Sequence, residues 1–324
     1  MKHSSSYVKQ LTLGVVAVVA CAAAFAQNTT AAKKPIVVGF AQIGAESDWR
    51  KANTKSMKDE AAARGITLNF SDAQGDQQKE ITAMRAFITQ GVDAIVLCPI
   101  VETGWEPVLQ EAKKAKIPVI VEDRTVKVSD PTLFAAFVGS DFKKEGQMAA
   151  DWLIKQSGGK GKILEIQGQP GSAAANDRHS SFVEALKAAP GLTIIDSQSG
   201  DFDLAKGKQV MEAFLKKYKP GDFSIVYAHN DDMALGAVQA IEEAGLKPGK
   251  DITIVSVDGG KKAVQAIVDG KINCVVECNP MHGPPVYDTV LKVLAGQPVQ
   301  KSAFDTDHLF DSTNAAEAVK TRPY

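Results

Sequence analysis

Residues 77–122 read QQKEITAMRAFITQGVDAIVLCPIVETGWEPVLQEAKKAKIPVIVE. Two short apolar runs, Ala94–Pro99 and Pro118–Glu122, each follow a stretch with apolar residues three and four positions apart, Gln77–Gln90 and Trp105–Lys116. Such uniformly apolar runs indicate strands that are buried on both faces. Buried strands separated by helices predict an α/β fold with parallel sheets covered on both sides.

The same alternation continues on both sides of this stretch. The predicted strands are Ile36–Gln42, Ile66–Ser71, Ala94–Pro99, Pro118–Glu122, Phe134–Val138, Lys162–Gln167, Leu192–Ser197, Ser224–His229, Thr253–Val257 and Ile272–Glu277. The pattern restarts after a break at about Asp130–Gly139, which predicts two blocks. Residues 281–324 offer one more helix, Val286–Ala295, and a polar tail. This last stretch has no core of its own, so we expect the chain to cross between the blocks more than once.

Composition limits the class of protein. A chain of 324 residues with 44% hydrophobic residues can bury a sizeable core and suggests about two domains. Its 37 Lys and Arg residues nearly balance 38 Asp and Glu residues, so no global basic field attracts nucleic acid.

The N-terminus predicts export. Leu11–Phe25 is almost wholly apolar, and Ala24-Phe25-Ala26 places small residues before a cut at Gln27, so residues 1–26 are predicted to be a signal peptide and the mature chain to be periplasmic. The apolar stretch is short for a membrane anchor, since spanning needs about 20 residues. Val18-Val19-Ala20-Cys21 leaves open a lipoprotein form acylated at Cys21.

Polar residues follow several predicted strands of the first block, where ligands bind in open parallel sheets. A guanidinium beside a carboxylate, as in Asp123-Arg124, can grip neighbouring hydroxyls, although the same pair is also compatible with a surface ion pair. Trp49 can stack on a sugar ring with Arg50 beside it, or open the following helix as a hydrophobic staple.

The second block repeats this chemistry with Arg178, Asn230 and Asp258. In the run His229-Asn230-Asp231-Asp232 we assign Asn230 to the ligand, Asp231 or Asp232 to the helix cap, and His229 to a structural hydrogen bond. Asp258 is either a helix cap or an acceptor for hydroxyls. Glu277 is the weakest candidate.

The sequence lacks the common motifs of catalytic sites and nucleotide sites. The chain has no G-x-S-x-G, G-x-x-x-x-G-K-[ST], H-E-x-x-H or early G-x-G-x-x-G motif. Cys274 and Cys278 are too far apart on a strand for a disulfide, and as a metal pair they have only His282 as an obvious partner. We therefore expect no catalytic residue, no metal and no cofactor.

The order of the motifs resembles the periplasmic sugar-binding proteins of ABC importers, in the ribose- and galactose-binding cluster. The residues that carry the resemblance are Ile36-Val37-Val38-Gly39-Phe40, Gln90-Gly91-Val92-Asp93-Ala94-Ile95, Ile117-Pro118-Val119 before Asp123-Arg124, and His229-Asn230-Asp231-Asp232-Met233-Ala234-Leu235-Gly236. Further stretches are similar to the galactofuranose-binding branch, namely residues 44–50, 103–108, 197–202 and 245–251.

This resemblance implies two Rossmann-like lobes joined by a three-crossover hinge, which close on a monosaccharide, galactofuranose or a related sugar. The implied lobes are residues 33–138 plus 280–308 and residues 139–279 plus 309–324. The implied ligand residues are Glu46, Trp49, Arg50, Asp123, Arg124, Arg178, Asn230, Asp258 and Glu277. The implied partner is the membrane permease of an ABC transporter, and the implied state is a monomer. Glu46, Trp49 and Arg50 stand where a ribose-type protein has aromatic residues, which argues against simple ribose specificity.

Two other functions remain open, and a third is disfavoured. Gene regulators share the two-lobe core, but they need an N-terminal helix-turn-helix where this chain has an export signal. A sugar-sensing receptor component for chemotaxis or signalling uses the same closed surface, and an exported sugar-active enzyme is a further alternative.

Overall fold

The computed structural model describes Met1, residues 34–219 and residues 221–324. The chain divides into a unit Met1–Lys34 and a compact unit Pro35–Tyr324, which carries the helices and strands given below. Apart from Met1, the predicted signal peptide of residues 1–26, with Cys21, lies outside the described residues. Its processing stays a prediction.

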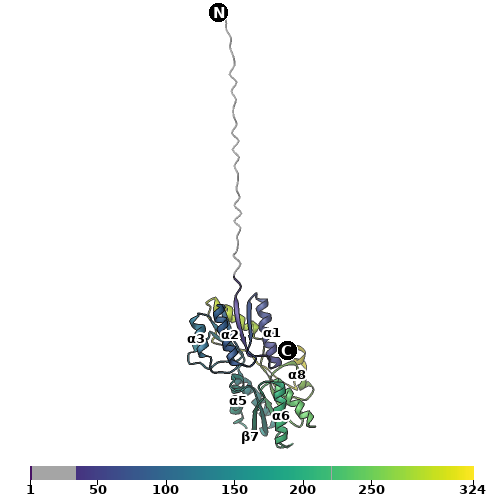
Figure 1. Cartoon of the computed structure of the whole chain (residues 1–324). Helices are drawn as coiled ribbons and strands as arrows, with labels where there is room; N and C mark the ends of the chain where they lie inside the picture. The colour runs from purple at the N-terminus through teal and green to yellow at the C-terminus, as the bar shows by residue number, and fades with distance from the viewer. Residues whose placement is uncertain (2–33, 220) are drawn as a thin grey trace. The chain divides into compact units, whose positions relative to one another are not determined.

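Six strands form the first sheet, in the order β11-β5-β4-β3-β1-β2, and every pair in it is parallel. The strands are β1 (Val37–Gln42), β2 (Thr67–Asp72), β3 (Ala94–Leu97), β4 (Val119–Glu122), β5 (Ala136–Gly139) and β11 (Ser302–Phe304). The helices packed with them are α1 (Asp48–Ala63), α2 (Gln77–Gln90), α3 (Glu106–Lys114) and α9 (Gly283–Leu294), with a 3-10 turn at Pro131–Leu133. We call this sheet and its helices the first lobe, in which Figure 1 shows α1, α2 and α3 together.

The second sheet repeats the first, with the order β12-β10-β9-β8-β6-β7. Its strands are β6 (Lys160–Gln167), β7 (Gly191–Ser199), β8 (Ile225–Ala228), β9 (Thr253–Asp258), β10 (Cys274–Glu277) and β12 (Leu309–Asp311). Its helices are α4 (Phe142–Ser157), α5 (Ala173–Leu186), α6 (Leu204–Lys217), α7 (Asp231–Glu243), α8 (Lys261–Val268) and α10 (Ala315–Thr321). Only the pair β10–β12 is antiparallel among the described strand pairs. We call this sheet and its helices the second lobe (Figure 1).

Each lobe has its own hydrophobic core. The central strands β3, β4, β8 and β10 are buried along their whole length, as expected for parallel strands covered on both faces. The buried apolar residues separate into one cluster for each lobe, with a single notable exception. Trp49 comes from α1 of the first lobe but belongs to the buried cluster of the second. The two-lobe α/β architecture predicted from the sequence is thus confirmed.

The chain crosses between the sheets three times. It leaves the first sheet after β5, returns after β10, and crosses again between β11 and β12. The predicted lobe boundaries, residues 33–138 plus 280–308 and 139–279 plus 309–324, stay our proposal. The assignment of β11 and β12 to different sheets supports them.

The last stretch of the chain holds more structure than its sequence predicts. β11 and β12 are three residues each, too short for an alternating pattern to show, and both are edge strands. The predicted polar tail also contains α10, where Ala315 is buried, and Phe310 of β12 is buried as well. This stretch adds to cores built by other segments, as expected.

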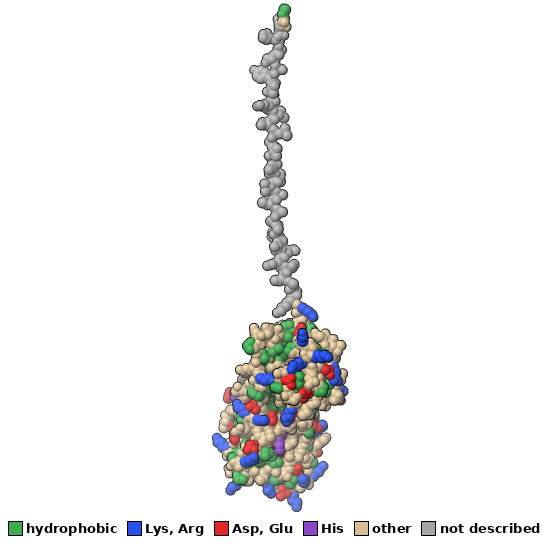
Figure 2. Space-filling view, turned by 90° about the vertical axis from the view of Figure 1, so that its left-hand side faces the viewer, with side chains coloured by type: hydrophobic (Ala, Val, Ile, Leu, Met, Phe, Trp, Pro, Cys, Tyr) green, Lys and Arg blue, Asp and Glu red, His purple; other side chains and the backbone are tan. Residues whose placement is uncertain are grey.

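The charges of the surface are mixed. Lysine and arginine side chains are interspersed with acidic ones on the face shown in Figure 2. Within the described residues, no helix is both long enough and apolar enough to cross a membrane.

Candidate functional site

The two lobes face each other across a cleft at the carboxyl ends of their strands. Six residues of the first lobe and six of the second line it. In open α/β sheets, ligands bind at this end of the strands. The lining residues are Glu46, Ser47, Trp49, Arg50, Asp123, Arg124, Phe142, Ala174, Arg178, Phe202, Asn230 and Asp258. The structure therefore brings together eight of the nine predicted ligand residues, and only Glu277 is not among the lining residues.

Arg50 is the centre of the first-lobe wall. Ser47 caps α1 by accepting a hydrogen bond from the backbone N–H of Arg50, which places Trp49 and Arg50 in the first turn. The Arg50 guanidinium donates to Asp123 Oδ2 at 2.6 Å and to Glu46 Oε1 at 3.2 Å, and it is only 2% exposed. Arg50 thus holds two carboxylates in place at the cleft.

Asp123 directly follows β4 and has a left-handed backbone with φ of 58°. Burial by itself would raise the pKa of its carboxyl, but the charges of Arg50 and Arg124 hold that pKa below its ordinary value. Asp123 therefore presents an ionised carboxylate. The thiol of Cys98 lies beside it, 3.5 Å from Asp123 Oδ2, and burial raises the pKa of that thiol well above its ordinary value.

Arg124 reaches from the first lobe toward the second. Its Nη1 donates to Ile100 O and to Gln169 Oε1, each at 3.3 Å, and its guanidinium lies 4.9 Å from the centre of the Phe202 ring. Gln169 and Phe202 both belong to the second lobe. These bonds are long, so Arg124 keeps much of its hydrogen-bonding capacity for a ligand.

Arg178 is the centre of the second-lobe wall and comes from α5. Its Nε donates to Glu145 Oε2 at 2.7 Å and its Nη1 to the backbone oxygen of His229 at 2.6 Å. Glu145 has no exposed surface, and burial raises its pKa in spite of the charge of Arg178. The guanidinium is thus anchored from behind, while the residue still lines the cleft.

Asn230 caps α7, which corrects the assignment of that cap to Asp231 or Asp232. Its Oδ1 accepts from the backbone N–H of Met233 at 3.0 Å, and its Nδ2 donates to the backbone oxygen of Phe202 at 3.1 Å. Asn230 therefore lines the cleft and also fixes the start of α7 and the backbone of Phe202. His229 is buried and bonds to Glu165, the structural role expected for it.

Trp49 joins the lobes. Its Nε1 donates to the backbone oxygen of Cys278 at 2.6 Å, and its ring packs edge-on against His282 with the ring centres 5.7 Å apart. Arg50 lies 4.7 Å above the Trp49 ring. This residue is bound to the second lobe rather than folded back on its own helix, so it does not act as a simple staple of α1.

Asp258 ends β9 with φ of 129°, a conformation that costs energy for a residue with a side chain. Of the two roles left open, it is not the helix cap, because Gly260 occupies that position in α8 without a side-chain bond. Burial, followed by the charge of Asp231, raises the pKa of Asp258 well above its ordinary value.

Sequence reasoning did not assign four of the lining residues to the ligand site, namely Ser47, Phe142, Ala174 and Phe202. Phe202 has a left-handed backbone with φ of 62°, and its ring lies so close to Gly168 that a side chain there would collide with it. The only signal in the sequence was the position of Phe202 after a predicted strand, because a left-handed phenylalanine has no recognisable pattern.

Glu277 lies behind the second-lobe wall. Its carboxylate accepts hydrogen bonds from Arg322 and from His308, and the residue is 7% exposed. Its charge is thus already paired within the protein.

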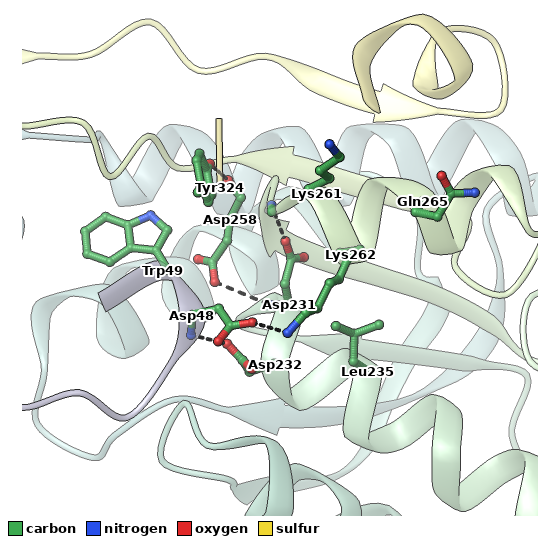
Figure 3. A pocket seen from close by; sticks show the side chains of 12 residues that line it. Asp48, Trp49, Asp231, Asp232, Leu235, Asp258, Lys261, Lys262, Gln265 and Tyr324 are labelled. Atoms are coloured by element: carbon green, nitrogen blue, oxygen red, sulfur yellow. Dashed lines mark hydrogen bonds and ion pairs between the residues drawn. The ribbon is translucent and has the colours of Figure 1, made fainter. Parts of the chain in front are cut away.

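The cleft is nearly closed in this conformation. Its cavity volume is about 20 Å³, room for roughly one water molecule, whereas small-molecule sites typically measure about 300–1,000 Å³. Two larger cavities adjoin it. One of about 530 Å³ shares Trp49 and Asp258 with the cleft, and one of about 580 Å³ shares Glu46. Figure 3 shows the first of these, with Trp49 on one side and Asp231, Lys261 and Lys262 on the other.

Direct contacts hold the lobes together beside the cleft, including at the rim of the cavity shown in Figure 3. On one rim, the backbone N–H of Asp48 donates to Asp232 at 2.8 Å, and Lys262 pairs with Asp48 at 2.5 Å (Figure 3). On another part of the seam, Asn176 donates to Glu102 at 2.6 Å. A ligand of sugar size therefore requires the lobes to separate.

Over Met1 and residues 34–219 and 221–324, no group of three or more His, Cys, Asp or Glu residues is placed to hold a metal ion. Cys98, Cys274 and Cys278 are free and buried.

Comparisons with known proteins agree with this geometry. A family model described as a periplasmic binding protein domain matches residues 36–298. The galactofuranose-binding protein YtfQ of Escherichia coli is 49% identical over 269 residues, which cover 82% of this chain and 85% of that protein.

Solved structures show the same similarity. The binding component of the arabinose ABC transporter from Shewanella, bound to α- and β-L-arabinofuranose, has a TM-score of 0.86 and 48% identity, covering 89% of this chain and 95% of that chain. A protein from Mycobacterium smegmatis in complex with β-D-fucofuranose also has a TM-score of 0.86 with 48% identity, over 88% and 94% of the two chains.

Proposed function

The chain belongs to the periplasmic binding protein family, and from this premise we propose that it is the substrate-binding component of an ABC sugar importer. In this proposal a monosaccharide in its furanose form binds between the two lobes. The observation that carries the proposal is a cleft whose twelve lining residues come equally from both lobes and include three arginines, three carboxylates and an asparagine.

These residues have the chemistry that a sugar needs. Ionised Asp123 accepts hydrogen bonds from hydroxyl groups, while Arg124 and Arg178 donate to hydroxyl or ring oxygens. Trp49 and Phe202 offer apolar ring surface to the C–H face of a sugar. We propose binding without catalysis, because the hydroxyl of Ser47 is already used to cap α1 and burial raises the pKa of the Cys98 thiol, so neither group is prepared to act as a nucleophile.

Lobe closure is part of the proposed mechanism. Because the cavity of the closed form is about 20 Å³, we propose that the sugar binds an open form and the lobes then close around it. The crossovers near residues 138–140 and 279–281 are the proposed hinges. Closure creates a joint surface of the two lobes, which the permease can distinguish from the open form. Small-angle scattering tests this, since the radius of gyration is expected to fall on binding; an unchanged radius would contradict it.

The preference for a furanose rests on the relatives, two of which hold L-arabinofuranose and β-D-fucofuranose. We propose galactofuranose or a closely related sugar as the ligand, because Glu46 and Arg50 add polar groups to the cleft that can bond the hydroxyls of an exocyclic arm. A thermal-shift panel of L-arabinose, D-galactose, D-fucose, ribose, glucose and maltose tests this preference. Stabilisation by the first three at high total concentration is expected, since free galactose is mostly pyranose. Saturating stabilisation by ribose or maltose alone would overturn it.

The mature protein is proposed to begin at Gln27, to act in the periplasm as a monomer, and to deliver its sugar to a membrane permease. The supporting observations are Ala24-Phe25-Ala26 and the family to which the chain belongs. The intact mass of the exported protein tests the start: a mass that includes a lipid on Cys21 would replace the soluble form with an anchored one. Light scattering of the same preparation tests the monomer.

A further inference from the structure

Glu277, the predicted ligand residue that does not line the cleft, is connected to the cleft residue Asp258 through Arg322 and Tyr324. Glu277 lies at the carboxyl end of β10, and its Oε1 accepts a hydrogen bond from Arg322 Nη1. Its other oxygen accepts from His308 Nδ1 at 2.6 Å. Two cations or donors thus fix the carboxylate, and Arg322, whose side chain is 10% exposed, is fixed by it in turn.

Arg322 in turn contacts Tyr324. Its Nη2 donates to the Tyr324 hydroxyl at 2.5 Å, and its guanidinium lies 4.9 Å from the centre of the Tyr324 ring. The hydroxyl has one proton of its own to donate. Its nearest acceptor is the backbone oxygen of Asp258 at 2.7 Å, followed by that of Cys278 at 3.2 Å. Figure 3 shows Tyr324 beside Asp258 and near Trp49.

The acceptor is a strained part of the cleft wall. Asp258 and Gly259 are successive residues with positive φ, 129° and 84°. For Asp258 this conformation is unfavourable and persists only where surrounding contacts impose it. Arg322 supplies one such contact, because a Cβ on Gly259 would lie 3.0 Å from its Nη2. The backbone oxygen of Tyr324 supplies another by accepting from the N–H of Lys261 at 2.6 Å, at the start of α8.

The same contacts reach the first lobe. The backbone oxygen of Cys278 accepts from Trp49 Nε1 at 2.6 Å and lies 3.2 Å from the Tyr324 hydroxyl. We propose that Tyr324 is a positioning residue of the ligand site: held by Arg322 and Glu277, it fixes the Asp258–Gly259 turn so that the Asp258 carboxylate faces the cleft. This inference rests on the proposed function for its ligand, but the support of the turn exists without one.

Tyr324→Phe tests the proposal, because it keeps the ring and removes only the hydroxyl. The affinity for L-arabinose, D-galactose or D-fucose, whichever stabilises the wild type, is expected to fall about 3- to 10-fold, the effect of one net hydrogen bond. Tyr218→Phe is the matched control: its hydroxyl bonds to Asp196 at 3.0 Å on β7, so it loses a comparable contact away from the cleft. Its affinity is expected to equal that of the wild type.

Hydrogen exchange of the ligand-free protein gives a second readout. The N–H groups of Gly259 and Gly260 donate to Asp231 Oδ2 at 2.9 and 2.7 Å, so their protection reports the order of the turn. Exchange at these two amides is expected to be at least about threefold faster in Tyr324→Phe and unchanged in Tyr218→Phe.

Two failures are thereby distinguished. If the wild type binds a sugar and Tyr324→Phe binds it equally well, the positioning role is overturned while the proposed function stands. If the wild type binds none of the three sugars, the proposed function fails, and unchanged exchange at Gly259 and Gly260 would then overturn the inference as well.

Discussion

The two lobes present equally buried arginines to the cleft but hold them in different ways. Arg50 and Arg178 are each 2% exposed. The carboxylate that holds Arg50, Asp123, lines the cleft itself, whereas the one that holds Arg178, Glu145, is fully buried behind it. The acid that the second lobe shows to the cleft is Asp258, which has no direct cation partner among the described ion pairs.

This difference separates two kinds of wall. In the first lobe, acid and base neutralise each other at the site, so Asp123 stays ionised. In the second lobe, Arg178 is paired from behind by Glu145, and Asp258 has no ion-pair partner of its own in the described part of the chain; burial and the charge of Asp231 raise the pKa of Asp258 in spite of the charge of Arg178. We therefore expect the ion pair Arg50–Asp123 of the first lobe and the acids of the second lobe to respond differently to substitution and to pH.

Removal of Arg178 is the largest expected effect. Arg178→Met leaves Glu145 buried without its partner and is expected to lower the free energy of unfolding by about 3–5 kcal/mol, measured by urea denaturation. Arg50→Met is expected to cost less, because Arg124 Nε remains 3.7 Å from Asp123 Oδ2. Equal losses in the two variants would break the comparison. The double variant Arg178→Met/Glu145→Leu is expected to recover stability but not sugar binding.

Arg124→Ala separates binding from stability within the first lobe. Its bonds to the protein are long, so the fold is expected to remain, while the affinity for sugar falls at least about tenfold through loss of a charged donor. Isothermal titration measures the affinity, with Lys187→Ala, an exposed lysine on the second lobe, as control. An affinity within twofold of the wild type would remove Arg124 from the site.

The stability of the protein is expected to depend on pH in opposite senses through Asp231 of the second lobe and Asp123 of the first. Burial raises the pKa of Asp231, which lies beside Asp258, to about 7. The folded protein then keeps a proton that the unfolded chain releases near pH 4, so Asp231 lowers stability as pH rises from about 4 to about 7, by at most about 1.4 kcal/mol per pH unit. Asp123, with its lowered pKa, acts in the opposite sense: its stabilisation is present above its ordinary pKa and is lost at lower pH.

Asp231→Asn tests this dependence. The amide oxygen can accept from Gly259 and Gly260 and its nitrogen can donate to Ser256, so the hydrogen bonds are retained while the titration is removed. Unfolding free energies measured at pH 5 and pH 7 are expected to differ less in this variant than in the wild type. Asp269→Asn, at an exposed carboxylate, is the control, and an unchanged difference in Asp231→Asn would contradict the assignment.

The smallest effect is expected at the rim. Lys262→Ala removes the ion pair with Asp48, in which both side chains are substantially exposed. The affinity is expected to change by less than about fivefold, since such pairs contribute about 0–1 kcal/mol. Any loss is expected to disappear at high salt. A large, salt-independent loss of affinity would show that the ion pair Lys262–Asp48, and not the residues around Arg50 and Arg178, controls closure.

The sequence predicts the scaffold of this site well. Buried strands such as β3 and β4 have an unmistakable apolar run, and polar residues at their carboxyl ends must gather at one edge of a parallel sheet. The same reasoning fails for β11 and β12, because three residues on an edge show no period. It also misses Phe202, whose left-handed backbone is imposed by its surroundings.

By itself, the sequence determined the α/β class, the two blocks and the strand ends after which Arg50, Asp123, Arg178 and Asp258 come, because periodicity and chain order are local properties. Only the tertiary structure decided how those groups are paired. It placed Glu145 behind Arg178, gave the cap of α7 to Asn230, and turned Glu277 away from the cleft toward Arg322. The pairs Arg178–Glu145 and Glu277–Arg322 join residues that are distant in sequence, so they depend on packing between elements and leave no pattern in the neighbouring residues.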